Sequence, residues 1–467
     1  TDAYYHVMMG DLGPGFCLQR SFPHTTLSLW HQRFYDKEFL FHALLSSLRR
    51  WHGLTGADSG PPFDFPAFFF YALSITVFAW LCYRYEMHSA WFWVLLYVVC
   101  FPGFTARLLM IRPHNLAILM MMPAASAFIR IRKKKQLWIP FVTGFAFAYA
   151  YSNPHFVVLP ALVAGAFCLR ERRRFATAMP VLAVTGVAAG FLLHPQSPNT
   201  FILWKVQCID VPFQILTGDV PVALGAELLR PDATWLKYNA GIFALVLVTA
   251  AVMLLLAAGN RLSDISREGR YFFILQLGTT LAVLVSRRWI EYAVPFSLFA
   301  SAILWRDTRT FRCELRSSQR KGLRAVAVIA VLTVLCMLPV NRRFTLPVRH
   351  EFSGFQEVAA GLEPGTLVAN LRWGDFPRLF YAAPHCRYLT GLDPMFAYVT
   401  HPEIMRQLYL FGQAEWMPTP AELHDLTGAN LAFVSQNDWA RVIIRDRGYV
   451  PVYYGPDGWV FDLTRER

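Results

Sequence analysis

Apolar residues in this chain are gathered into long runs that contain almost no charge. The runs are mostly about 16 to 20 residues long, which is the length of helix that crosses a hydrocarbon core of about 30 Å. Clear runs cover residues 65–83, 89–108, 115–129, 175–193, 239–258 and 325–340, and weaker runs cover 137–151, 155–169, 271–285 and 292–305. The pattern predicts a polytopic α-helical membrane protein.

The pattern changes after about residue 349, where polar residues return and the apolar runs shorten to strand length. We predict strands at 366–370, 387–390, 431–434, 449–454 and 459–463, and helices at 376–383, 402–412 and 439–447. The tetrapeptide Gly-Pro-Asp-Gly at 455–458 is a strong turn signal between the last two strands. This alternation predicts a small α/β soluble domain at the C-terminus.

Composition supports the membrane prediction, because 55% hydrophobic and only 16% charged residues is too apolar for a soluble chain of 467 residues. The formal charge of +13 raises the possibility of a nucleic-acid partner. A nucleic-acid binder gathers basic residues on a soluble face among aromatic stacking groups. Here they lie between apolar runs, so we expect membrane lipids and no nucleic acid as partners.

Short basic loops give the chain a direction across the membrane. They cover residues 130–135, 170–174, 261–270 and 306–324, and two predicted spans separate each loop from the next. The positive-inside rule places them in the cytoplasm. We therefore predict a first outer loop at 1–64, a transmembrane domain at 65–344 with an outer loop at 194–238, and an outer domain at 345–467.

The chain begins without Met, and we expect a further span before Thr1. Residues 38–51 have a helical apolar pattern but end in basic residues, which predicts a helix lying along the interface; a short crossing helix is the alternative. We expect the bacterial inner membrane as the location, with the active site and C-terminal domain outside the cytoplasm. The eight cysteines lack metal or redox spacing.

Asp2 and His6 stand with Tyr4 and Tyr5 within one helical turn on the predicted outer face. This combination resembles the first outer loop of the GT-C class of membrane glycosyltransferases, which includes the catalytic subunits of oligosaccharyltransferases. The resemblance implies that Asp2 acts at the reaction centre on the acceptor, with His6 beside it. The alternative is that Asp2 only caps an interfacial helix.

Asp36, Lys37 and Glu38 form a second charged cluster in the same loop. It resembles the Asp-Lys-x-x-Leu element of lipid-A aminoarabinose transferases and relatives of protein mannosyltransferases. A lysine between two acids at a membrane surface can hold a phosphate while an acid positions an acceptor. A surface ion-pair cluster is the alternative.

Arg112 and His114 lie in the second outer turn, together with Arg107 and Asn115. Arginine at a membrane boundary is costly, and an anionic lipid headgroup would offset that cost. Metal-dependent oligosaccharyltransferases carry an Asp-x-Glu motif in this turn, whereas this sequence has no carboxylate there. The resemblance therefore favours the metal-independent branch, with polyprenyl-phosphate sugars as donors and no cofactor; a divalent metal is the alternative.

Two later outer turns also carry polar residues. Asn153 and His155 join two spans, where they fit a polar cavity or a solvated turn. Arg287 and Arg288 go against the positive-inside bias and suit a phosphate or diphosphate leaving group. The GT-C class has arginines at a corresponding place, although a pairing of either arginine with Glu291 is the alternative.

Trp373 and Asp375 in the soluble domain resemble, loosely, the Trp-Trp-Asp-Tyr-Gly region that holds the acceptor peptide's hydroxyl in oligosaccharyltransferases. The second Trp and the Tyr-Gly ending are absent, so a peptide acceptor does not follow. The alternative is a helix start capped by Asp375 and a turn at Asp393-Pro394.

These residues predict an inverting glycosyltransferase that moves a sugar from a polyprenyl-phosphate donor to a glycan, lipid or protein acceptor on the outer side of the membrane. A transporter or flippase of an anionic lipid is the alternative, although such proteins usually show internal repeats and this sequence shows none. A third possibility is a non-catalytic scaffold whose soluble domain binds a partner.

Overall fold

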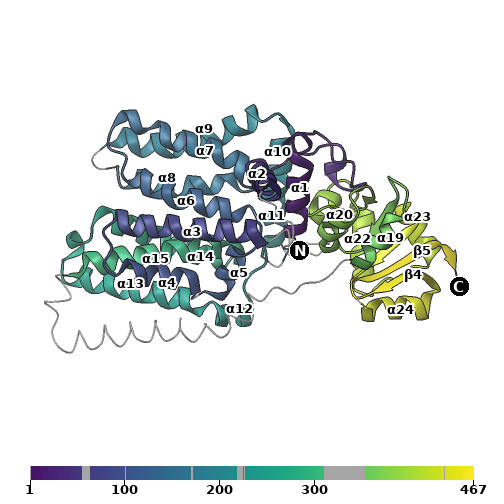
Figure 1. Cartoon of the computed structure of the whole chain (residues 1–467). Helices are drawn as coiled ribbons and strands as arrows, with labels where there is room; N and C mark the ends of the chain where they lie inside the picture. The colour runs from purple at the N-terminus through teal and green to yellow at the C-terminus, as the bar shows by residue number, and fades with distance from the viewer. Residues whose placement is uncertain are drawn as a thin grey trace. The chain divides into compact units, whose positions relative to one another are not determined.

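The structure of the chain, a computed structural model, forms two compact units (Figure 1). It describes residues 2–54, 64–99, 101–169, 172–217, 225, 227–309, 353–435 and 437–466. Unit 1 combines Thr1–Phe63, Phe191–Leu224 and Val348–Arg467, and unit 2 combines Asp64–Gly190 and Gly225–Pro347. We describe each unit by itself.

Unit 2 is built from the apolar runs. Its helices are α3 (Asp64–Arg84), α4 (Ala90–Val99), α5 (Pro102–Leu108), α6 (His114–Ile129), α7 (Trp138–Ala150), α8 (Val158–Ala166), α9 (Arg173–Leu193), α12 (Ala233–Tyr238), α13 (Ala240–Ala258), α14 (Arg267–Val283) and α15 (Ile290–Asp307). Every run predicted within the described residues is thus helical, and the run at 325–340 lies outside them. The run at 89–108 forms two helices because Pro102, which lacks an amide hydrogen, begins α5.

Three of the described helices are long and apolar enough to cross a membrane, at Phe65–Arg84, Arg173–Leu193 and Ala240–Ala258. Their large apolar side chains are exposed at positions such as Phe68, Tyr83 and Leu247, which are 69%, 82% and 70% accessible. Such surfaces are unfavourable in water and suit lipid. The helices are therefore compatible with a membrane protein.

Close helix packing and a buried central helix organise unit 2. A Cβ atom at Gly144 in α7 or at Gly186 in α9 would overlap a backbone carbonyl of the facing helix, so the two helices approach as only glycine allows. Helix α15 is buried along its length from Ile290 to Leu304. A polar side chain at the start of α15 must therefore find its partners inside the protein.

Unit 1 contains the first segment of the chain and the C-terminal α/β part. Its sheet has the order β2-β1-β3-β5-β4, in which β1 is parallel to β2 and β3, and β5 is antiparallel to β3 and β4. The strands are β1 (Leu367–Asn370), β2 (Arg387–Tyr388), β3 (Leu431–Val434), β4 (Tyr449–Gly455) and β5 (Gly458–Glu466). This confirms the predicted strands, although β2 is shorter than 387–390.

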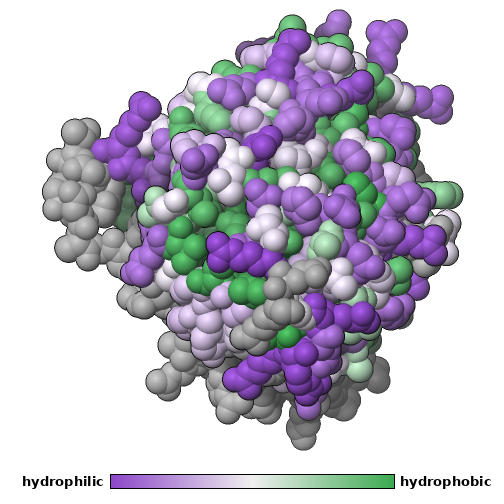
Figure 2. Space-filling model, turned by 90° about the vertical axis from the view of Figure 1, so that its right-hand side faces the viewer, coloured by the Kyte–Doolittle hydropathy of each residue, from purple (hydrophilic) through white to green (hydrophobic). Residues whose placement is uncertain are grey.

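The helices of unit 1 come from all its segments. They are α1 (Asp2–Cys17), α2 (Phe39–Leu54), α10 (Asn199–Lys205), α11 (Val211–Thr217), α19 (Ser353–Ala360), α20 (Phe376–Ala382), α21 (Pro394–Tyr398), α22 (Pro402–Gly412), α23 (Pro420–Thr427) and α24 (Asn437–Arg447). The predicted helices at 376–383, 402–412 and 439–447 are present as α20, α22 and α24. Figure 2 shows the side of the molecule on which α24, β4 and β5 lie in Figure 1. Most residues on this surface are hydrophilic, as expected for a soluble part.

The first segment is joined to the α/β part by backbone hydrogen bonds. The amide of Thr26 donates to the carbonyl of Tyr388 over 2.8 Å, and the amide of Tyr388 donates to the carbonyl of His24 over 2.8 Å. Helix α1 also packs on α20, where the rings of Tyr4 and Tyr381 meet edge to face at 5.4 Å. The first segment is thereby joined to β2, and α1 is held against α20.

Candidate functional site

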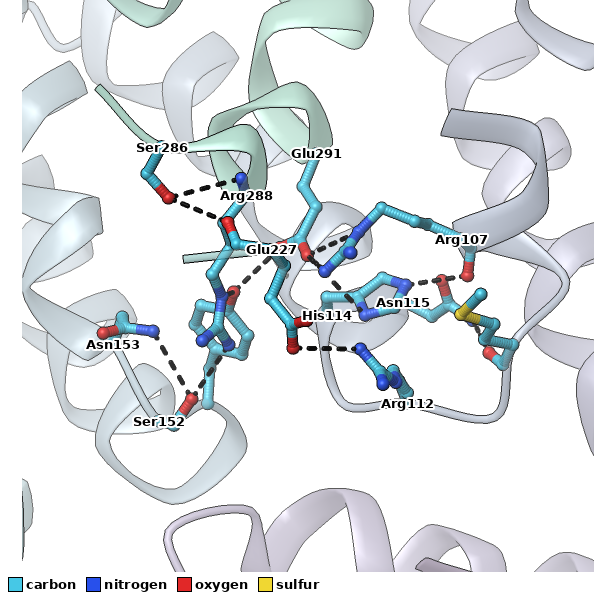
Figure 3. Close-up of polar contacts among 12 residues, drawn as sticks. Arg107, Arg112, His114, Asn115, Ser152, Asn153, Glu227, Ser286, Arg288 and Glu291 are labelled. Carbon is cyan, nitrogen blue, oxygen red and sulfur yellow. Dashed lines mark hydrogen bonds and ion pairs between the residues drawn. The ribbon is translucent and has the colours of Figure 1, made fainter. Parts of the chain in front are cut away.

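Polar residues from several helix ends meet in unit 2 (Figure 3). Arg107 is at the end of α5, His114 begins α6, and Tyr151 follows α7. Arg288 lies in the 3-10 turn Arg287–Trp289, directly before Glu291 in the first turn of α15. The sequence places each of them where a helix ends, and the fold brings these ends together.

Glu291 is the centre of this cluster and is fully buried. Its Oε1 atom accepts hydrogen bonds from Nε of Arg107 at 2.9 Å and from Nη2 of the same guanidinium, and its Oε2 atom accepts from the Tyr151 hydroxyl at 2.8 Å. Nδ1 of His114 lies 3.8 Å from Oε1. A buried carboxylate needs such partners to offset its lost hydration.

Arg288 has a different environment from the other arginines. Its Nε donates to the Tyr151 hydroxyl at 3.0 Å and its Nη2 donates to Oγ of Ser152 at 3.1 Å, so both bonds go to neutral oxygens. The expected alternative, a direct pairing of Arg287 or Arg288 with Glu291, is not found. Arg107 bonds Glu291 instead, and Arg287 pairs with the exposed Asp232 at 2.7 Å.

The turn after α5 is braced by its own polar residues. Nε2 of His114 lies 2.7 Å from the carbonyl of Arg107, and the side-chain amide of Asn115 donates to the carbonyls of Leu108 and Met110. Arg112 lies 3.4 Å from Glu227. Residues 107 to 115 include two arginines and no carboxylate, and the carboxylates that contact this turn come from Glu227 and Glu291.

Asn153 and His155 lie beside the same cluster in the chain. Asn153 is buried and its amide donates to Ser152 at 3.4 Å. His155 is in the short 3-10 helix Pro154–Val157, with its ring against Phe156 at 4.8 Å. Ser152 thus links Asn153 to Arg288, whereas His155 has its ring contact within its own turn.

A second polar cluster lies in unit 1. It joins Asp36 and His6, which were predicted as site residues, through His42, which was not. Nδ1 of His42 lies 2.8 Å from Oδ2 of Asp36, and Nε2 of His42 lies 2.9 Å from Nδ1 of His6. All three side chains are buried, at 1%, 1% and 2% accessibility. Burial lowers the pKa of His42, but Asp36 and Glu38 together raise that pKa by more, so the net shift is upward.

The other predicted residues of the first segment surround this cluster. Asp2 begins α1 one turn before His6, which places the two on the same side of the helix. Lys37 donates to Oε1 of Gln207 at 2.7 Å, and its Nζ lies 5.5 Å from the centre of the Phe396 ring. Glu38 is buried at 5% accessibility.

The start of the loop after α9 holds the first segment in place. Oε1 of Gln196 accepts from the amide of Asp36 at 2.9 Å, and the side-chain amide of Asn199 donates to the carbonyl of Phe34 at 2.9 Å. His194 packs edge to face against Tyr35 at 4.9 Å. Burial lowers the pKa of His194 to about 4, while Asp36 acts in the opposite direction.

A cavity of about 330 Å³ opens at the carboxyl ends of β1 and β2, where open parallel sheets usually bind ligands. It is lined by Asn370, Leu371, Arg372, Trp373, Gly374, Thr390, Pro394, Met405, Leu408, Tyr409, Gly412 and Gln413. Trp373 is therefore part of a cavity wall.

Asp375 comes directly after the cavity-lining residues Trp373 and Gly374 in the chain and directly before the first residue of α20. It is 7% accessible, and it makes no side-chain cap hydrogen bond, so the capping alternative is not realised. Burial raises the pKa of Asp375 to about 6, against the opposing effects of Ser435, Arg372 and Arg378. Asp393-Pro394 forms a helix start and not the turn of the alternative, because the side chain of Asp393 accepts from the amide of Met395 at 3.0 Å and caps α21.

Comparison with solved structures shows that the chain has the fold of the GT-C glycosyltransferases. It is similar to the oligosaccharyltransferase of Archaeoglobus fulgidus in its apo form, with a TM-score of 0.58 and 12% identity over 96% of this chain. The chain spans 65% of that protein's length. The resemblance to the GT-C class is thereby confirmed at the level of the fold.

Two further structures of the Archaeoglobus enzyme agree. The complex with an inhibitory peptide and a dolichol-phosphate has a TM-score of 0.54 at 12% identity, covering 98% of this chain and 69% of that one. The complex with Zn and sulfate has a TM-score of 0.54 at 12% identity, covering 99% and 69%. No family model matches the chain, and no curated protein matches it by sequence.

Proposed function

We propose that the chain is a membrane glycosyltransferase that moves a sugar from a polyprenyl-phosphate donor to an acceptor on the outer side of a bacterial inner membrane. The observation that carries the proposal is Arg288, a guanidinium bonded to the neutral hydroxyls of Tyr151 and Ser152 beside a buried ion pair. Its charge suits a phosphate group. The dolichol-phosphate in a structure of similar fold supports a lipid-linked donor.

In this proposal, the arginines of unit 2 stabilise the negative charge that develops on the departing lipid phosphate. Arg288 contacts the phosphate, while Arg112 and Arg287 add positive potential and His114 holds the turn after α5 in shape. Lys37 of unit 1 is a further phosphate-binding candidate. Because guanidinium groups supply the charge here, we propose that the leaving phosphate needs no divalent cation.

The groups that position the acceptor and take its proton are assigned to unit 1. The acceptor's nucleophilic atom attacks the anomeric carbon, the bond from that carbon to the phosphate oxygen breaks, and the acceptor's proton passes to Asp2. The configuration at the carbon inverts. Asp36 and His6, joined through His42, position this end of α1. Further residues assigned to the acceptor cavities are Glu38, Asn153, His155, Trp373 and Asp375.

Sugar transfer by the purified chain tests the proposal. The chain in detergent is incubated with a panel of polyprenyl-phosphate sugars, and release of polyprenyl phosphate and labelling of glycan, lipid and peptide acceptors are followed. Donor-dependent release supports the proposal. Movement of a labelled polyprenyl-phosphate lipid across reconstituted vesicles without any release would instead identify a flippase and overturn the proposal.

A further inference from the structure

His6, Glu38 and His42 bring three ligand-type atoms within 4.8 Å of one another inside unit 1. His6 lies on α1, His42 on α2, and Glu38 directly before α2. All three are buried, at 2%, 5% and 1% accessibility. Two imidazoles and a carboxylate are a set of ligands that first-row transition metals use in proteins.

We infer that His6, His42 and Glu38 form a mononuclear site for a divalent transition metal such as Zn²⁺, with Asp36 orienting His42. None of these ligands comes from the 107–115 turn, where the sequence offers no carboxylate. The site supplies three protein ligands and leaves a fourth position for water or another small ligand. This inference does not rest on the donor or acceptor of the proposed reaction.

The hydrogen bond of His42 to Asp36 is the first argument for the site. Nδ1 of His42 lies 2.9 and 2.8 Å from the two carboxylate oxygens, so this nitrogen carries the proton. In the neutral ring the lone pair is then on Nε2, the atom that faces His6. A carboxylate that fixes a histidine in this way is a common outer partner of metal-bound imidazole.

The distance between the two rings is the second argument. Nε2 of His42 and Nδ1 of His6 are 2.9 Å apart. Two nitrogens that share a tetrahedral Zn²⁺ ion at about 2.0–2.1 Å are themselves about 3.3–3.4 Å apart, so the two rings would separate by only a few tenths of an ångström. The rings are also held in place, because Tyr5 packs edge to face on His6 at 5.4 Å and on His42 at 5.9 Å. Binding a metal would need little rearrangement of either ring.

Charge is the third argument. Asp36 and Glu38 are both buried carboxylates, and Lys37 between them directs its Nζ to Gln207. Buried charges are costly unless they are compensated. A divalent cation among Glu38 and the two histidines would place positive charge beside both carboxylates.

Cys17, Asp36 and His42 form an overlapping set of possible ligands. We favour the site at Nε2 because the Cys17 thiol donates to the carbonyl of Met9 at 3.5 Å and Nδ1 of His42 is bonded to Asp36. A metal in the overlapping set would displace both bonds. The two sets differ in whether sulfur is a ligand, which is visible by spectroscopy.

Titration of the purified full chain with Co²⁺ tests the inference. After removal of metals with a chelator, we expect a visible d–d absorption that saturates at about one Co²⁺ per chain and is displaced by Zn²⁺. His6→Gln and His42→Gln should abolish it, and Asp36→Asn should weaken affinity about 10- to 100-fold. The matched control is His385→Gln, a half-buried histidine that bonds the carbonyl of Ala359, and it should bind like the unaltered chain.

Folding of the variants is controlled in the same experiment. Glu38→Gln keeps the shape of the side chain but removes its charge, and it should lose most of the affinity. Zn²⁺ should raise the melting temperature of the unaltered chain and of His385→Gln alike, less that of Asp36→Asn and Glu38→Gln, and not that of His6→Gln or His42→Gln. Absence of Co²⁺ absorption in the unaltered chain, unchanged binding in His42→Gln, or a thiolate charge-transfer band that Cys17→Ser removes would each overturn the inference. Sugar transfer is not a readout here.

Discussion

Arg288 donates from Nε to the hydroxyl of Tyr151 over 3.0 Å, and that hydroxyl donates in turn to Glu291 over 2.8 Å. The tyrosine thus stands between the arginine and the carboxylate. Because Glu291 is bonded directly to Arg107, the charge of Arg288 is directed to neutral oxygens. This is the arrangement expected for a cation that binds an anionic ligand rather than one that only balances a buried acid.

Arg288→Gln is therefore expected to impair sugar transfer more strongly than folding. Loss of one preorganised donor to the developing phosphate charge should lower kcat by about 10²- to 10³-fold. The measurement is release of polyprenyl phosphate under single-turnover conditions. Arg445→Gln, which alters an exposed arginine paired with Asp446, is the control. Turnover by Arg288→Gln within a few-fold of the unaltered chain would contradict the assignment.

Glu291→Gln should act mainly on stability. It leaves the partly buried guanidinium of Arg107 without its carboxylate, and breaking a buried pair in this way typically costs up to about 3–5 kcal/mol. The double variant Arg107→Gln with Glu291→Gln removes both charges, so its loss should be smaller than the sum of the two single losses. Chemical unfolding of the three variants in detergent measures this, and strictly additive losses would show that the pair is not coupled.

Much of the fold could be predicted because its signals are local. The apolar runs predicted the helices of unit 2, and the turn signal at 455–458 predicted the hairpin of β4 and β5. The bonds of Thr26 with Tyr388 could not be predicted in this way. They join residues that are far apart in sequence, and a single edge pairing leaves no periodic pattern in either segment.

The site was predicted less completely. Arg288, His6 and Asp36 were identifiable because their types are unusual at a predicted membrane boundary. His42 was not, since a single histidine in a helix gives no sign of its neighbours, and its bonds to Asp36 and His6 depend on how α1 packs on α2. The pairing of Glu291 with Arg107 likewise depends on where α5 and α15 meet, which sequence spacing does not encode.

Asp2→Asn should abolish transfer while leaving expression and donor binding near normal. Asparagine keeps the shape of Asp2 at the start of α1 but cannot take the acceptor's proton. Donor binding by retention of a labelled polyprenyl-phosphate sugar is measured beside transfer. Asp11→Asn is the matched control on the same helix, since Asp11 pairs with Arg49 at the surface. Unchanged transfer by Asp2→Asn would rule out the proposed role.

The buried carboxyl of Asp375 should make stability depend on pH. Burial raises its pKa to about 6 in the folded chain, whereas an unfolded Asp titrates near about 3.9. The contribution of the Asp375 carboxyl to the free energy of unfolding is therefore complete below the unfolded pKa. It is lost as pH rises through about 6, by about 3 kcal/mol at most. Asp375→Asn lacks this loss, so its stability relative to the unaltered chain should rise between about pH 4 and 6 and then level off. Thermal unfolding across this range measures the difference.

Asp446→Asn is the control because Arg445 holds the pKa of that exposed carboxyl low through a hydrogen bond, which predicts no rise. A difference for Asp375→Asn that stays flat with pH would show that the carboxyl titrates normally.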